Sequence, residues 1–157
     1  MLRIAGQIGA HCDTLRSAPD FHRFRLTRGE ERELLDLVVD RSPQLDAEKM
    51  TIGGIRVDTL REMIANKLAT LVSRTEMKDV VDLYFLEQAG HDLLAAIPDA
   101  QAKDGGWEPA VVSMLLDGLR NAEVPPWLLR PVSPEEIRAF IERLRLAIAA
   151  RALPPDP

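Results

Sequence analysis

Four charged side chains in the middle of this sequence occupy positions where helical spacing favours apolar residues. Lys67 and Arg74 are two helical turns apart, and Asp79 and Asp82 are close to one turn apart. Burying a charge is costly unless the charge is paired or used. A basic stripe followed by an acidic stripe therefore predicts either direct ion pairing or a shared polar pocket.

The basic pair lies on a predicted helix that begins near residue 59. Thr59 and Glu62 have the spacing of a capping box, and Asp58 adds negative charge at the helix start. At about 100° per residue, Lys67 falls in the middle of the apolar stripe. The apolar residues of that stripe are Leu60, Met63, Ile64, Leu68 and Leu71.

The acidic pair lies on a second predicted helix, from about Met77 to Gln88, which ends before Gly90. Asp79 and Asp82 share a face of this helix with Leu83 and Leu86. Two interpretations remain open at this point. The charges form either a structural network between the helices or the wall of a functional site. The sequence pattern does not separate the two, because structural ion pairs and functional sites both perturb ionisable groups.

Composition limits the class of protein. The chain has 157 residues, of which 46% are hydrophobic and 29% are charged, so it is long enough for one domain with a real core. No apolar run reaches the length of a membrane span, and one cysteine rules out an internal disulfide, which predicts a cytoplasmic protein. A net charge of −5 gives no overall basic surface for nucleic acid.

The N-terminal third predicts a small antiparallel sheet. Residues 21–26 alternate apolar and basic side chains, residues 32–40 form a second strand candidate, and a turn at Gly29 joins them as a hairpin. Asp36 interrupts the apolar run of the second strand, so it is either an edge residue or a site residue. We expect Arg23, Arg25 and Arg28 to lie near one side of the first strand, as a basic patch or as a solvated face.

The remainder is predicted to be mostly helical. Residues 1–20 fit a short helix or a frayed segment, and residues 51–57 fit a short strand. Helices are predicted at residues 92–100, from Pro109 and from Ser133. The predicted class is α+β, a small β element followed by four or five helices. The predicted divisions are a β region at 1–57, a helical domain at 58–153 and a disordered tail at 154–157.

The charged motifs of the two helices, at residues 67–74 and 78–82, together resemble those of the AbiEii/AbiGii-type nucleotidyltransferase toxins. That family has a helix with a lysine, a small residue and an arginine seven positions after the lysine, which Lys67, Ala69 and Arg74 match. A Lys-Asp-x-x-Asp helix follows, matched by residues 78–82, and the strand around Asp36 is similar to the strand with the family's third metal-binding acid.

The resemblance implies a polymerase-β-like enzyme that transfers a nucleotidyl group from a nucleoside triphosphate to an RNA or protein acceptor. Lys67 would then bind the triphosphate with Arg74, and Asp36 would contribute to a Mg²⁺ site. Asp79 would act as a base or hold the lysine, and Asp82 would be a structural support. A cognate antitoxin is a further partner that the resemblance implies, whereas a membrane is not.

One departure from the family pattern limits these expectations. No Asp-x-Asp pair precedes Asp36, and one acid does not hold two magnesium ions, so we expect the chain as given to be inactive. Three hypotheses follow: a reading frame that begins upstream, an inactive remnant that still binds a nucleotide or an antitoxin, and a non-catalytic helical interaction module with structural salt bridges.

Overall fold

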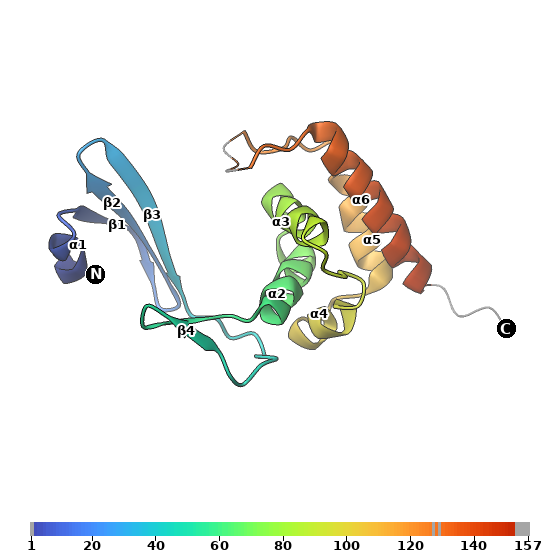
Figure 1. Cartoon of the computed structure of the whole chain (residues 1–157), viewed down its shortest axis with the longest axis horizontal. Coiled ribbons are helices and arrows are strands. Elements are labelled where there is room, and N and C mark those ends of the chain that lie inside the picture. The colour runs from blue at the N-terminus through green and yellow to red at the C-terminus, as the bar shows by residue number, and fades with distance from the viewer. Residues whose placement is uncertain (1, 127, 129, 153–157) are drawn as a thin grey trace. The chain divides into compact units, whose positions relative to one another are not determined.

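The computed structural model describes residues 2–126, 128 and 130–152, and it contains two compact units, Met1–Arg41 and Ser42–Pro157 (Figure 1). The first unit ends before the predicted division at residue 57, because the segment after residue 42 is bonded to the helices. Lys103 donates to the carbonyl of Pro43, and Glu62 accepts from the amides of Leu45 and Asp46. The tail predicted at 154–157 lies outside the described residues.

The N-terminal unit is a three-stranded antiparallel sheet with one short helix. Its elements are α1 (Leu2–Gln7), β1 (His11–Ala18), β2 (Phe21–Arg28) and β3 (Glu31–Val38), with β2 in the middle. The predicted hairpin of β2 and β3 is confirmed. Its two-residue turn contains Gly29 at φ +60°, a conformation that favours glycine. Strand β1 was not predicted, because Cys12 is its only buried residue and the strand lacks a regular apolar alternation.

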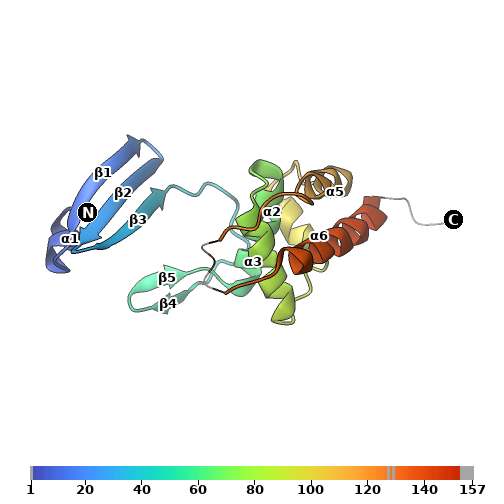
Figure 2. The same cartoon turned by 90° about the horizontal axis from the view of Figure 1, so that it is seen from above.

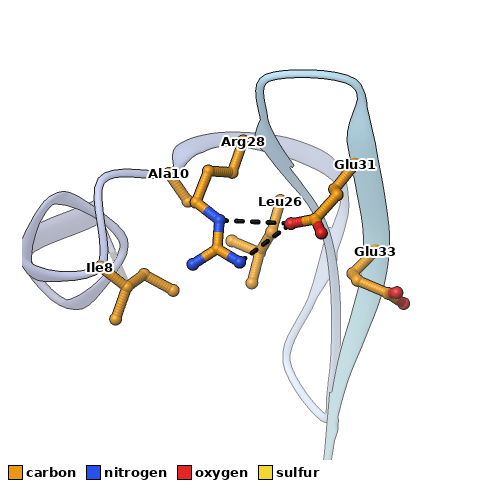
Figure 3. Close-up of a pocket in the computed structure, with 6 residues that line it drawn as sticks. All are labelled: Ile8, Ala10, Leu26, Arg28, Glu31 and Glu33. Carbon is orange, nitrogen blue, oxygen red and sulfur yellow. Dashed lines mark hydrogen bonds and ion pairs between the residues drawn. The ribbon is translucent and has the colours of Figure 1, made fainter.

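The strand register corrects one expectation about the arginines. Arg23 and Arg25 share a face of β2, but Arg28 is an odd number of residues away and lies on the opposite face. There Arg28 pairs with Glu31 at 2.9 Å and lines a small pocket beside α1 (Figure 3). The prediction that all three arginines lie on one side of the strand is therefore wrong, and only Arg23 and Arg25 share a face.

The C-terminal unit is a short hairpin followed by a helical bundle, and Figure 2 shows its elements from a second direction. The hairpin is β4 and β5, and the helices are α2–α6 with a 3₁₀ turn at the end. Their bounds are β4 (Met50–Ile52), β5 (Ile55–Val57), α2 (Leu60–Ser73), α3 (Met77–Gln88), α4 (Ile97–Lys103), α5 (Pro109–Gly118), α6 (Pro134–Ala149) and η1 (Ala150–Ala152). The predicted α+β class is confirmed.

Local sequence signals set most helix ends correctly. The Thr59 hydroxyl accepts the amide of Glu62, and Ser133 forms a complete capping box with Glu136. The helix predicted at 92–100 is wrong in position, since α4 begins only at Ile97. Asp92 Oδ1 accepts the amides of Leu94 and Ala95, which favours a turn over the first helical turn.

The core of the C-terminal unit is built from all five helices, α2–α6, with α4 packed against α2 and α5 running alongside α6 (Figure 1). The helix predicted from Ser133 is α6, and its apolar residues Ile137, Phe140, Ile141, Leu144 and Ile148 are buried. Trp107, between α4 and α5, is also buried, and its indole N–H donates to the carbonyl of Leu68 at 2.9 Å. No helix in the described part of the chain is long and apolar enough to cross a membrane.

Candidate functional site

The candidate site is built on the connection between α2 and α3. Arg74 is the C-cap of α2, directly after Ser73, and its amide donates to the carbonyl of Thr70. Thr75 follows at φ +47°, in the left-handed region that a β-branched residue rarely adopts, and its hydroxyl donates to the Leu71 carbonyl at 2.6 Å. Only Arg74, Thr75 and Glu76 separate the two helices. This tight connection brings the basic stripe of α2 next to the first turn of α3.

Asp79 is the centre of the charge network. It lies in the first turn of α3, where the helix dipole favours a negative charge, and its side chain is fully buried. Arg74 donates to it from Nε at 2.9 Å and from Nη2 at 2.8 Å, and Lys67 Nζ donates at 3.0 Å. Direct ion pairing, one of the two arrangements that the spacing predicts, is therefore present.

Asp82 has a different environment from Asp79. Its carboxylate is 2.5 Å from Lys67 Nζ, but its side chain is 49% exposed, against 0% for Asp79. Lys67 is itself 31% exposed and lies between the two acids. Asp79 is thus the buried partner of the lysine, and Asp82 is the partner next to solvent.

Three groups of this network, Asp79, Lys67 and Arg74, are stabilised in their ionised forms. Burial on its own would raise the pKa of Asp79, but hydrogen bonds from Arg74 and Lys67 outweigh burial and lower that pKa. Partial burial would lower the pKa of Lys67, but its bonds to Asp82 and Asp79 raise it. The bond to Asp79 likewise raises the pKa of Arg74. A carboxylate that resists protonation is a poor proton acceptor, so this environment suits Asp79 to holding cations.

An open pocket of about 270 Å³ adjoins the exposed side of this network. Lys67 and Asp82 form its polar end, and Met63, Phe85 and Leu86 supply its apolar lining. The pocket joins a cation to an apolar surface, which is the combination that recognises an anion attached to a flat or apolar group.

Asp36, the fifth predicted site residue, lies on β3 in the N-terminal unit. Arg23 donates to both of its carboxylate oxygens at 2.7 Å. In the part of the chain that the structure describes, no group of three or more His, Cys, Asp or Glu side chains could hold a metal ion. The described residues do not by themselves fit a magnesium site, and the predicted role of Asp36 as a metal ligand stays a prediction.

A second, fully buried ion pair was not predicted from the sequence. Glu62 on α2 accepts a bond from Lys103 on α4, and both side chains are almost completely inaccessible. Burial on its own would raise the pKa of Glu62, but the bond from Lys103 and the two backbone amides that fix its other oxygen lower it. The spacing of Thr59 and Glu62 predicts a capping box, but the Glu62 side chain bonds Lys103, 41 residues away, and only the Thr59 hydroxyl acts as a cap.

Comparison with known proteins gives one finding for this chain. A family model described as "Nucleotidyl transferase AbiEii toxin, Type IV TA system" matches residues 14–153. The match includes both helical motifs at 67–82 and the strand that carries Asp36. Neither the curated proteins nor the solved structures gave a significant match.

Proposed function

Because this chain belongs to the AbiEii nucleotidyl transferase toxin family, we propose that Lys67 and Arg74 bind the triphosphate of a nucleoside triphosphate. The observation that carries the proposal is that both cations meet at one buried carboxylate and still reach solvent. Their side chains are 31% and 43% exposed. Anchored cations with an exposed side are the arrangement that phosphate recognition needs.

The donor groups of the two cations support this proposal. Lys67 has three N–H donors and uses two on Asp79 and Asp82, while Arg74 has five and uses two on Asp79. Counted over the described residues, one ammonium donor and three guanidinium donors remain for an incoming oxyanion. The pocket beside Lys67 is the proposed place for the rest of the nucleotide.

We assign Asp79 to positioning rather than to proton transfer. Its lowered pKa and its complete burial support a role in holding Lys67 and Arg74 at a fixed separation. The alternative role of Asp79 as a base stays a prediction of the family resemblance.

In the proposed reaction, an acceptor hydroxyl of RNA or protein attacks the α-phosphorus of the nucleotide. The bond from that phosphorus to the bridging oxygen breaks, pyrophosphate leaves, and the acceptor proton passes to solvent or to a base. The contribution we assign to this chain is binding of the triphosphate. No step is assigned to Mg²⁺, because the described residues do not assemble a site for it.

Family membership also supports two proposals about the setting. A toxin of a toxin–antitoxin system is expected to have a cognate antitoxin as a partner. We propose that this chain acts in the cytoplasm, where nucleoside triphosphates and RNA are available.

One observation favours a second function, a non-catalytic helical module. The two cations and two acids of the network cancel in charge and pair with one another. A purely structural network has this property as well, and such a network needs no ligand.

Thermal unfolding with nucleoside triphosphates separates the two functions. At ligand about tenfold above the Kd of the parent protein, we expect the Tm to rise by about 3 °C in the parent protein and by no more than about 1 °C in Lys67→Met. Lys49→Met is the control, because Lys49 is also a partly buried lysine paired with an aspartate, Asp58. Equal shifts in the parent protein and Lys67→Met would favour the structural module.

A further inference from the structure

We propose that Asp82 competes with phosphate for Lys67. The Asp82 carboxylate pairs with the Lys67 ammonium group until the phosphate oxygens of a bound polyphosphate displace it. The proposal rests on the proposed triphosphate site and adds a determinant of its affinity. It assigns Asp82 a role other than structural support.

The first argument is the difference between the two acids that bind Lys67. Asp79 is inaccessible and accepts three hydrogen bonds. Breaking its contact with Lys67 would therefore leave a buried carboxylate with one cation fewer and no access to water. Among the residues that the structure describes, Asp82 has one ion pair, and its side chain is half exposed, so water can solvate it when it leaves Lys67. Asp82 is therefore the partner that an incoming anion can replace.

The second argument is position. Asp82 and Lys67 together form the polar end of the open pocket, whereas Asp79 and Arg74 do not line it. An anion that enters this pocket meets the Asp82 carboxylate beside the Lys67 ammonium, at 2.5 Å. Two anionic groups at one ammonium repel each other, so binding requires the Asp82 side chain to turn away.

The consequence is that Asp82 lowers the affinity of the site for anions. Replacing it with a neutral residue of the same shape frees one Lys67 donor and removes a repelling charge. We expect Asp82→Asn to bind inorganic triphosphate roughly threefold to tenfold more tightly than the parent protein. This range corresponds to the free energy of breaking one exposed ion pair and of the repulsion by one nearby charge.

The experiment is a calorimetric titration of the full chain with inorganic triphosphate at constant ionic strength. Asp117→Asn is the matched control, because Asp117 is also a half-exposed aspartate in surface ion pairs and its loss changes net charge equally. Its affinity should equal that of the parent protein. Asp82→Glu keeps the charge and should also bind like the parent.

The outcomes distinguish this inference from the proposed function. Tighter binding by Asp82→Asn, lost again when Lys67→Met is added, supports the competitor role. If Lys67→Met abolishes binding but Asp82→Asn binds equally or more weakly, then Asp82 is a support and the inference is overturned while the triphosphate site stands. If neither the parent protein nor Asp82→Asn binds triphosphate, the inference and the proposed function both fail.

Discussion

Arg74 donates two hydrogen bonds to Asp79, from Nε at 2.9 Å and from Nη2 at 2.8 Å, across the connection between α2 and α3. This bidentate contact fixes the plane of the guanidinium, while Lys67 binds the same carboxylate from α2 at 3.0 Å. A single buried acid thereby sets the separation of two cations. Stability and anion binding both depend on Asp79, and they can be measured separately.

Asp79→Asn should destabilise the protein by about 2 kcal/mol, because it leaves two cations without their buried carboxylate. The cost stays moderate because both cations are partly exposed and can turn to water. Asp82→Asn is the matched variant and should cost less than about 1 kcal/mol, since Asp82 is half exposed. Urea unfolding checks both values, and equal losses would contradict the assignment of Asp79 as the centre of the network.

The contribution of Asp79 should depend on pH in a defined direction. Its folded-state pKa is lowered, so its stabilisation is fully present above the unfolded-state pKa of about 4 and is lost as pH falls through the folded-state pKa. The difference in unfolding free energy between the parent protein and Asp79→Asn should therefore shrink below about pH 4.

Urea unfolding at several pH values between 7 and 2.5 measures that difference. The pKa values of Glu62 and Asp99 are also lowered, but their contributions occur in both proteins and cancel on subtraction. A difference that stays constant with pH would mean that Asp79 is not stabilised as a carboxylate.

The buried Glu62–Lys103 pair should show strong coupling. Lys103→Met leaves a buried carboxylate without its cation and should cost about 3 kcal/mol. Adding Glu62→Gln removes the buried charge and keeps an acceptor for the amides of Leu45 and Asp46, so the double variant should recover most of this loss. A double-mutant cycle from urea unfolding measures the coupling free energy between Glu62 and Lys103. If the stability losses of the two single variants simply add in the double variant, the two residues are not coupled.

The left-handed conformation of Thr75 predicts an order among its variants. Thr75→Ala loses the hydroxyl bond to Leu71 and keeps the unfavourable φ of +47°, whereas Thr75→Gly loses the bond and relieves the backbone. Thr75→Gly should therefore be about 1 kcal/mol more stable than Thr75→Ala. Thermal unfolding of both variants gives the order, and a less stable glycine variant would refute it.

The parts of the fold that depend on local signals could be predicted from the sequence. The end of α3 and the capped start of α6 follow from Gly90 and Ser133. Helical spacing indicates that the basic stripe of α2 and the acidic stripe of α3 meet, by direct pairing or around a shared polar pocket. The missed features depend on contacts between distant segments. The Glu62–Lys103 pair spans 41 residues, and no periodicity of the sequence indicates it.

The surroundings of the two acids also required the structure. Spacing places Asp79 and Asp82 on one face of α3, but it does not tell which of them the connection at residues 74–76 buries. Strand β1 was missed because a strand with so few buried residues lacks a hydrophobic alternation.

The central claim is that Lys67 and Arg74 bind the phosphates of a nucleotide, and calorimetric titration with each of the four nucleoside triphosphates tests it most directly. We predict binding by the parent protein and by Lys49→Met, and at least about tenfold weaker binding by Lys67→Met, which loses a charged donor to phosphate. Lys67→Met should remain folded, because Arg74 still holds Asp79. Nucleotide binding that is equally strong in Lys67→Met, or absent from the parent protein, would contradict the claim.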